Sequence, residues 1–273
     1  MIIQTSQTKV NVELFPSSER GSTFVFLLHG FTGSASDWEE VIPLLPKKFS
    51  YAAADLIGHG KREAPENIEL YSANSLVQQL DQVFNQLTKK KFILLGYSMG
   101  GRAALTYAVH HPEKLSGLIL ESTSAGIADE KLREERRQSD AKIIKLIEEK
   151  PLEEFIDYWI NQDLFATLKT FPAEKLAKIQ NSKFKIQKIG LINSLKGFGT
   201  GVMPALYNEI HLITSKTLLI TGELDTKFTK INSELVELFP KAEQVIVKNA
   251  GHNVHLEKPE EFVKSLYKFL EAN

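Results

Sequence analysis

The sequence predicts an α/β protein with a mostly parallel sheet, helices on both faces of the sheet and an inserted helical lid. Two observations favour this class. Continuously apolar runs such as 24–28 (FVFLL) and 91–95 (KFILL) alternate with helical patterns, which is typical of parallel strands buried on both faces. Between about 124 and 208 strand patterns disappear and charged helical segments dominate, and strand patterns resume at 216–221 (KTLLIT).

Each element follows from its local pattern. The alternation of TKVNVEL at 8–14 predicts an edge strand with one buried face. The segment after Pro259 predicts a final helix over 259–271. The other expected strands are 24–28, 51–54, 91–95, 118–120, 216–221 and 244–247, and the other expected helices include 36–45, 72–89, 99–110 and 131–150.

The chain of 273 residues is long enough for one large core with an insertion. We expect residues 1–123 and 209–273 to form the core and residues 124–208 to form the inserted helical lid. An insertion at the carboxyl end of a strand covers the edge of the sheet at which ligands bind.

Composition excludes several classes of function. The 33 basic and 34 acidic side chains nearly cancel, so a nucleic-acid partner is not expected. The lack of cysteine excludes disulfides, thiolate catalysis and cysteine zinc sites. No apolar run approaches the roughly 18 residues of a membrane span, and the first residues do not resemble a signal peptide. We therefore expect a soluble, cytoplasmic monomer or weak homodimer without membrane contact.

A G-x-S-x-G motif spans Gly96 to Gly100, with a strand before it and a helix after it. This setting predicts a sharp turn that exposes Ser98 as a nucleophile. The alternative interpretation is a glycine-rich helix start that is capped by the serine.

The nucleophile needs a base and an acid that orients this base, and both are expected in loops after later strands. His252 follows the strand at 244–247, and Asp225 follows the strand at 216–221. Glu223 lies in the same loop as Asp225 and competes for the role of the acid. His29 and His59 each adjoin a glycine after a buried strand and are expected to shape the pocket floor by hydrogen bonding. The other histidines are expected at the surface or at helix ends, apart from His255 in the loop of His252.

Two backbone N–H groups are expected to form an oxyanion hole. One belongs to Phe31, in the loop after an early strand, and the other to Met99, directly after the nucleophile. The alternative for the first loop is an ordinary turn. The glycine-rich run at 197–201 is not a phosphate loop, because no strand precedes it and Pro204 follows. No ligand cluster for a metal is visible, so neither a metal nor a cofactor is expected.

Four motifs, HGFTGS at 29–34, DLIGHG at 55–60, GYSMGG at 96–101 and AGHNVHLEKPEEF at 250–262, resemble the α/β-hydrolase superfamily. Further segments, among them ERRQSD in the insertion and GFGTGVMPALY at its end, resemble the menaquinone-pathway synthases that make 2-succinyl-6-hydroxy-2,4-cyclohexadiene-1-carboxylate. The resemblance implies an α/β-hydrolase fold and a carbon–oxygen lyase. Such an enzyme eliminates pyruvate from 2-succinyl-5-enolpyruvyl-6-hydroxy-3-cyclohexene-1-carboxylate, with the triad as base and the oxyanion hole on the succinyl carbonyl.

A substrate with three carboxylates needs fixed cations. Arg102 lies four residues after Ser98 on the same helix face and can lean back toward it. The resemblance singles out Arg102 and Arg136 as carboxylate ligands. It also places Lys183 where relatives often have arginine, which makes Lys183 a third candidate carboxylate ligand, with a charge but without the bidentate fork of arginine. The neighbouring lid arginines Arg133 and Arg137 are spaced so that they could also point inward, although a solvated helix face is the alternative.

The resemblance also implies that Tyr97 and Trp159 line the pocket, with core packing as the alternative. The runner-up function is that of a carboxylesterase or another small-molecule hydrolase of the same fold. A ligand-binding protein that retains the fold without turnover is a third class.

Overall fold

The computed structural model describes residues 1–271, so the last two residues of the predicted core, 272 and 273, lie outside this part of the chain. The described strands are β1 (Ile2–Gln4), β2 (Lys9–Phe15), β3 (Phe24–Leu28), β4 (Ser50–Ala54), β5 (Phe92–Tyr97), β6 (Leu115–Glu121), β7 (Lys216–Gly222) and β8 (Ala242–Val247). They form one sheet in the order β1-β2-β4-β3-β5-β6-β7-β8. β2 pairs antiparallel with β1 and β4, and the other neighbouring strands are parallel.

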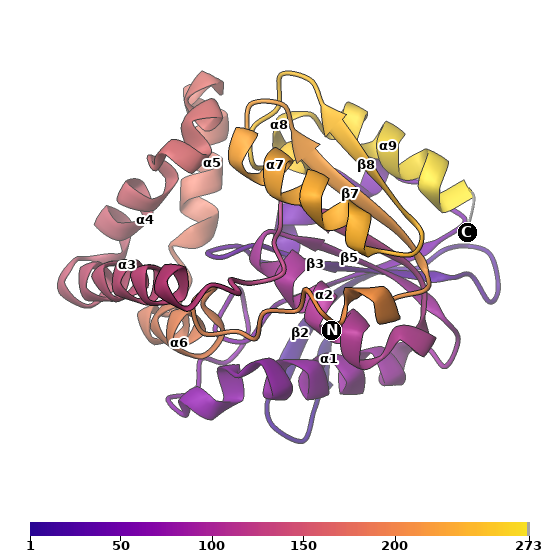
Figure 1. Cartoon of the computed structure of the whole chain (residues 1–273), viewed down its shortest axis with the longest axis horizontal. Helices are drawn as coiled ribbons and strands as arrows, with labels where there is room; N and C mark the ends of the chain where they lie inside the picture. Colours follow the sequence, from indigo (N-terminus) through magenta and orange to yellow (C-terminus); the bar gives the residue numbers. More distant parts are fainter. Residues whose placement is uncertain (272–273) are drawn as a thin grey trace.

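Helices connect the strands and cover both faces of the sheet (Figure 1). None of the helices described in residues 1–271 is both long and apolar enough to cross a membrane. The α-helices are α1 (Ala73–Leu87), α2 (Met99–His110), α3 (Glu130–Glu149), α4 (Leu152–Ile160), α5 (Ala173–Lys183), α6 (Lys188–Phe198), α7 (Thr226–Leu235), α8 (Val254–Glu257) and α9 (Pro259–Glu271).

The strands bury alternate residues on opposite faces of the sheet. Phe26 and Leu94 belong to the apolar cluster that includes α1 and α2, and the ring of Phe84 from α1 lies 4.2 Å from that of Phe26. Leu27 belongs to the cluster on the other face, which α9 covers with side chains such as Phe262. Because both faces exclude water, the central strands show continuous apolar runs in the sequence.

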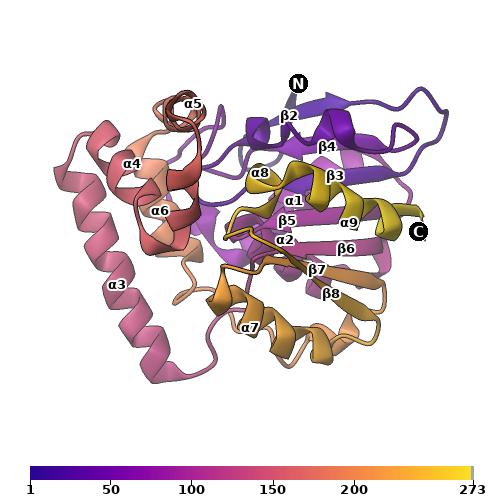
Figure 2. The same ribbon diagram turned by 90° about the horizontal axis from the view of Figure 1, so that it is seen from above.

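Helices α3 to α6 form a helical insert that leaves the sheet after β6 and returns before β7. Figure 2 shows these helices gathered at one end of the strands. The insert has an apolar core of its own, which contains Ile147, Phe155 and Leu191. It lies over the carboxyl ends of the parallel strands, because residues of the insert and of these strand ends line a common cavity.

The predicted fold class is confirmed, and two local predictions are wrong. The segment expected as an edge strand is β2, whose outer side pairs with the three-residue strand β1. The helix expected over 36–45 is instead two short 3-10 helices, Ala35–Trp38 and Ile42–Leu44. Pro43 cannot donate a backbone hydrogen bond, so a continuous helix through this segment would lose a bond in its interior.

Candidate active site

Ser98 occupies the turn between β5 and α2 with a φ of 51° and a ψ of −108°. A positive φ is unfavourable for a residue with a Cβ. Two hydrogen bonds hold this conformation. The N–H of Ser98 donates to the carbonyl of Glu121 (2.8 Å), and the hydroxyl of Thr123 donates to the carbonyl of Ser98 (2.8 Å). The turn therefore presents the serine side chain at the carboxyl end of the sheet.

The glycines of the motif allow backbone contacts that no side chain would permit. A Cβ on Gly96 would lie 2.2 Å from the carbonyl oxygen of Gly100, and a Cβ on Gly100 would lie 2.2 Å from that of Leu28. Such contacts are far inside van der Waals distance. These glycines are thus required by the close packing of α2 against β5 and β3.

His252 connects the serine to a buried carboxylate. Its Nε2 lies 3.0 Å from Oγ of Ser98, and its Nδ1 lies 2.6 Å from Oδ2 of Asp225. His252 and Asp225 are both buried. The contact with the carboxylate favours the tautomer in which Nδ1 carries the proton, which leaves Nε2 free to accept the serine proton.

The structure distinguishes the two candidate acids in the loop after β7. Asp225 caps α7, because its Oδ1 accepts a hydrogen bond from the N–H of Phe228 (3.2 Å) while its Oδ2 faces His252. The carboxylate of Glu223 instead accepts a bond from the N–H of Asn249 (3.0 Å) and is exposed. Asp225 is therefore the carboxylate that contacts His252.

Two backbone N–H groups border the serine without an acceptor. The N–H groups of Phe31 and Met99 have no hydrogen-bond partner within residues 1–271. Both residues line the same cavity as Ser98. Free donors beside a nucleophile are what stabilises an oxyanion that forms there.

The serine opens onto a cavity of about 650 Å³ between the sheet and the insert. This volume lies in the range of sites that enclose a small organic ligand. The basic side chains on its wall are Arg102, Arg136 and Lys227, and the acidic ones are Asp129 and Glu135.

Arg102 projects from α2 to the insert. Its Nη1 donates to the carbonyl of Phe198 at the end of α6 (2.7 Å), and the guanidinium carbon lies 5.4 Å from the centre of the Phe198 ring. Burial first, and then the charge of Arg136, lowers the pKa of Arg102 to about 9. The group is still a cation at neutral pH, and most of its N–H donors have no partner within the described chain.

Arg136 approaches the cavity from α3 and pairs with Asp140 one turn later. Its Nε lies 2.8 Å from Oδ1 of Asp140. Burial raises the pKa of Asp140, although the positive charges of Arg136 and Arg102 oppose this shift. Asp140 therefore links the two cavity arginines electrostatically, while the terminal nitrogens of Arg136 are not hydrogen-bonded to any residue in 1–271.

The other two arginines of α3, Arg133 and Arg137, do not line the cavity. Arg133 donates to the carbonyls of Ile127 and Val202, and Arg137 pairs with acidic residues of its own helix. Arg137 also donates to the carbonyl of Gly201 (3.2 Å), so both side chains tie α3 to neighbouring segments and neither lines the cavity.

Tyr97 and Trp159 belong to an aromatic wall between the serine cavity and a second pocket. Phe31 and Phe165 complete this wall, since all four residues line both spaces. The Trp159 ring lies 5.0 Å from that of Phe31 and 6.0 Å from that of Phe165. Burial, and next the charge of Glu121, raises the pKa of Tyr97 well above its usual value, so this phenol stays neutral.

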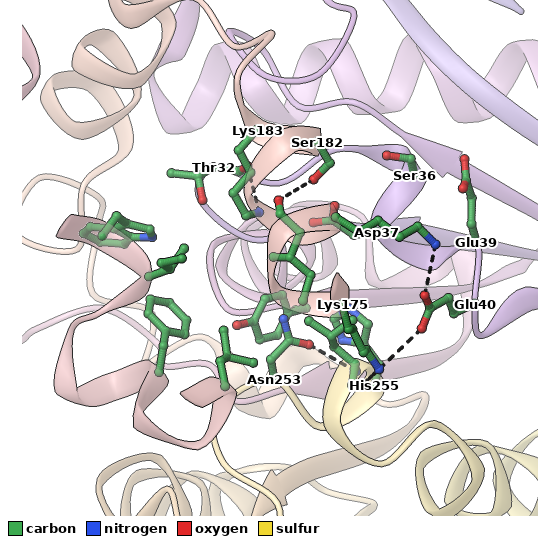
Figure 3. Close-up of a pocket in the computed structure, with 18 of the residues that line it drawn as sticks. Thr32, Ser36, Asp37, Glu39, Glu40, Lys175, Ser182, Lys183, Asn253 and His255 are labelled. Atoms are coloured by element: carbon green, nitrogen blue, oxygen red, sulfur yellow. Dashed lines mark hydrogen bonds and ion pairs between the residues drawn. The ribbon is translucent and has the colours of Figure 1, made fainter. Parts of the chain in front are cut away.

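Lys183 lies in the second pocket rather than in the serine cavity (Figure 3). This pocket encloses about 130 Å³ between α5 and the loops that follow β3 and β8. The Lys183 ammonium donates to the carbonyl of Thr32 (3.1 Å). Nearby, Lys175 and Lys178 of α5 pair with Glu40. The structure thus separates Lys183 from the arginines with which it was grouped.

His29 and His59 are buried behind the loop of Phe31. Nε2 of His29 accepts a hydrogen bond from the N–H of Leu56 (2.9 Å), and its Nδ1 bonds the carbonyl of Gly30 (2.7 Å). Burial lowers the pKa of His29, and burial with the charge of His29 lowers that of His59 to about 3. Both rings are therefore neutral hydrogen-bonding groups at neutral pH.

Sequence reasoning missed the roles of three ionisable groups beside the site. Glu121 and His255 form a buried pair beneath Tyr97, and Asp140 lies between the cavity arginines. The only sequence signal for Asp140 is its spacing of four residues from Arg136. Glu121 is the last residue of β6, a position from which a side chain can reach the site.

Within residues 1–271 no group of three or more histidine, cysteine or acidic side chains is arranged to hold a metal ion.

Comparison with known proteins places this geometry in context. The α/β-hydrolase fold family matches residues 23–259. A Bacillus subtilis (strain 168) protein described as a candidate 2-succinyl-6-hydroxy-2,4-cyclohexadiene-1-carboxylate synthase is 40% identical over 249 residues, which cover 91% of this chain and 90% of that protein. The synthase of that name from Enterobacter sp. (strain 638) is 31% identical over 88% of each chain.

Solved structures show the same similarity. The structure of MenH from S. aureus superposes with a TM-score of 0.91 at 29% identity and covers 96% of this chain and 98% of its own. An esterase from Exiguobacterium antarcticum has a TM-score of 0.84 at 22% identity, over 99% of this chain and 98% of its own. The second likeness concerns the fold alone.

Proposed function

The chain belongs to the α/β-hydrolase fold family, and from this premise we propose that it is a lyase that forms 2-succinyl-6-hydroxy-2,4-cyclohexadiene-1-carboxylate for menaquinone biosynthesis. The substrate would be 2-succinyl-5-enolpyruvyl-6-hydroxy-3-cyclohexene-1-carboxylate, and pyruvate would be the second product. The similarity to the Bacillus and Enterobacter proteins supports this reaction. The proposal requires a base, an oxyanion site and cations for carboxylates, and each has a candidate in the cavity.

The names of substrate and product define the bonds that change. The ring of the substrate has one double bond, between C3 and C4, and the product has two, from C2 to C3 and from C4 to C5. A proton therefore leaves C2, beside the succinyl carbonyl, and the C5–O bond breaks. The electron pair of the C–H bond moves through the ring, and the expelled enolpyruvate takes up a proton to become pyruvate.

Ser98, His252 and Asp225 would act together as the base for the C2 proton. His252 Nε2 is 3.0 Å from Ser98 Oγ and can take the proton of the serine hydroxyl. The serine oxygen then becomes basic enough to remove the proton from C2. The buried carboxylate of Asp225, 2.6 Å from Nδ1, stabilises the imidazolium that results. No covalent intermediate is needed for this role of the serine.

The N–H groups of Phe31 and Met99 would stabilise the charge that develops on the succinyl carbonyl when C2 loses its proton. Both line the serine cavity and lack other acceptors in the described part of the chain. Donors held in place by the backbone stabilise such an enolate without reorganisation, and a single donor of this kind typically contributes about 3 kcal/mol.

Arg102 and Arg136 would bind substrate carboxylates. Arg102 uses Nη1 for the carbonyl of Phe198 and a weak contact with Met203, and Arg136 uses Nε for Asp140. The remaining N–H groups are free to bind a carboxylate through two parallel bonds. We also propose that residues 124–208 act as a lid, because Arg136 and Trp159 approach the ligand from this segment.

One observation carries the proposal: Ser98, which is hydrogen-bonded through His252 to Asp225, lines one cavity of about 650 Å³ together with two arginines. The test is to supply the substrate from its upstream enzyme and to record pyruvate with a coupled lactate dehydrogenase assay. We expect the rate of pyruvate release to be proportional to the amount of protein added, and the Ser98→Ala variant serves as the blank. Retention of the compound without pyruvate would instead identify a binding protein.

The same catalytic geometry also suits ester hydrolysis, which keeps a carboxylesterase as the second candidate. A serine, a histidine and two N–H donors are what acyl transfer requires. Rapid cleavage of short p-nitrophenyl esters without pyruvate release from the cyclohexene would favour this function. The two cavity arginines argue against it, since a neutral ester offers them no partner.

A further inference from the structure

Glu121 and His255 form a buried ionisable pair that the proposed mechanism does not use. Oε2 of Glu121 lies 2.8 Å from Nδ1 of His255, and Oε1 accepts a hydrogen bond from the backbone N–H of His255 at 3.0 Å. The two side chains are 0% and 1% exposed. Both carboxylate oxygens are thus satisfied by a single residue, which is a well-defined geometry.

The pair connects the two chain segments that carry the nucleophile and the base. The backbone carbonyl of Glu121 accepts the hydrogen bond from the N–H of Ser98 (2.8 Å), which holds the strained turn. His255 lies in α8, which begins two residues after His252. The residue that fixes Ser98 by its backbone therefore fixes the His252 segment by its side chain.

Aromatic contacts complete this connection. The His255 ring stacks on Trp38 at 4.2 Å and meets the ring of Tyr97 edge-on at 5.0 Å, and the same Tyr97 ring lies 5.4 Å from that of His252. Figure 3 shows His255 on the wall of the second pocket, beside Asn253. The pair therefore lies behind the triad, out of contact with the serine cavity.

An apolar pair of the same volume would stabilise a fold at least as well as a buried ion pair, because desolvation of the two groups offsets their attraction. What the hydrogen-bonded pair adds is direction, since hydrogen bonds orient groups more strictly than apolar contacts do. We propose that Glu121 and His255 are positioning residues that hold His252 Nε2 in line with Ser98 Oγ. This inference rests on the triad of the proposed function and is independent of the substrate.

Two variants of His255 separate the hydrogen bond from the ring. His255→Asn keeps a donor near the position of Nδ1 and removes the ring, whereas His255→Phe keeps the ring and removes the donor. We expect kcat of His255→Phe to fall about 100-fold, as for a misplacement of about 1 Å, with KM changed less than about threefold because the carboxylate-binding residues are untouched. We expect His255→Asn to recover most of kcat.

A second readout makes the test independent of the substrate. Phenylmethanesulfonyl fluoride modifies activated serines, so its rate with Ser98 reports the Ser98–His252 geometry directly. We expect this rate to fall in parallel with kcat in His255→Phe. His211→Phe is the matched control, because His211 is exposed, and in this variant the rate should stay unchanged. A protein that reacts with the reagent but releases no pyruvate would refute the proposed function and leave the positioning test in force.

The double variant Glu121→Met/His255→Phe distinguishes positioning from stability. It removes the stranded carboxylate, so thermal unfolding should return close to that of the unmodified chain. If the pair positions His252, kcat and the rate of serine modification stay low in this variant. Recovery of both rates together with stability would overturn the inference, and so would an unchanged rate of serine modification in a folded His255→Phe protein.

Discussion

Replacing Arg102 by Met, and separately by Lys, tests whether the cavity is built for an anionic substrate. Methionine keeps an unbranched apolar stem against Phe198 and removes the charge, whereas lysine keeps the charge and loses the planar fork. Arg102 lines the cavity with Ser98 and is a cation at neutral pH, since its pKa is lowered only to about 9. The unmodified chain, Arg102→Met and Arg102→Lys therefore differ mainly in the charge and the hydrogen-bond donors that position 102 presents to a carboxylate.

The expected magnitude follows from the contacts of Arg102. Removal of the charged partner of a carboxylate in a partly buried site lowers transition-state stabilisation by about 2–5 kcal/mol. This loss corresponds to a fall of about 30- to 5,000-fold in kcat/KM. The carbonyl of Phe198 also loses its donor, so we expect Arg102→Met to lose about 1–3 kcal/mol of unfolding free energy. Arg102→Lys should recover part of both losses.

The assay compares kcat/KM for the cyclohexene substrate with kcat/KM for p-nitrophenyl acetate, which is neutral. Arg137→Met is the matched control, because Arg137 is an arginine of helix α3 that pairs with Glu130 and Glu134 outside the cavity. Thermal unfolding of each variant shows that it is folded. Small and equal effects of Arg102→Met on both substrates would refute the assignment of a carboxylate to this arginine.

Three further predictions concern the triad, a buried histidine and the serine turn. Asp225→Asn should lower kcat about 10³- to 10⁴-fold, and Glu223→Gln should change it less than about twofold, as the Glu223 carboxylate bonds the N–H of Asn249 and does not contact His252; pyruvate release measures both, and the reverse order would make Glu223 the acid. The pKa of His59 in the folded chain is lowered to about 3, so between about pH 6.5 and 3 this histidine takes up a proton only in the unfolded chain. The free energy of unfolding therefore falls on acidification through this range. Between pH 7.5 and 5 the unmodified chain should lose about 2 kcal/mol more unfolding free energy in urea than His59→Asn, and equal losses would contradict the shift. Gly100→Ala should lower kcat at least about 100-fold, because its Cβ would meet the Leu28 carbonyl at 2.2 Å; near-normal turnover would show that this contact relaxes.

The sequence predicts the central strands well because each is buried on both faces. Runs such as 24–28 and 91–95 are recovered as β3 and β5 with the same apolar residues. The three residues of β1 are too few for a pattern, so the true edge of the sheet was missed. Short 3-10 helices fail for a similar reason, since they lack the length over which a helical period can be recognised.

For the site, the sequence locates groups whose position follows from strand ends. Ser98, Asp225 and His252 each follow a parallel strand, and the sheet brings these ends together. The partner of a side chain is harder to predict. Nothing near Glu121 in the sequence points to His255, which lies 134 residues away. Lys183 illustrates the same limit, because helix α5 turns it toward Thr32 and the second pocket.

Under the proposed function, the division of the cavity between core and insert would let one fold serve two chemistries. The core would provide the base and the N–H donors, which can act on an ester or on a C–H bond beside a carbonyl. The insert provides Arg136, and it receives the Nη1 hydrogen bond of Arg102 through Phe198. The charges that would distinguish a tricarboxylate from an ester therefore lie where α2 meets the insert. Substitutions at this boundary should change which substrate reacts, whereas substitutions beneath Ser98 should change the rate for every substrate alike.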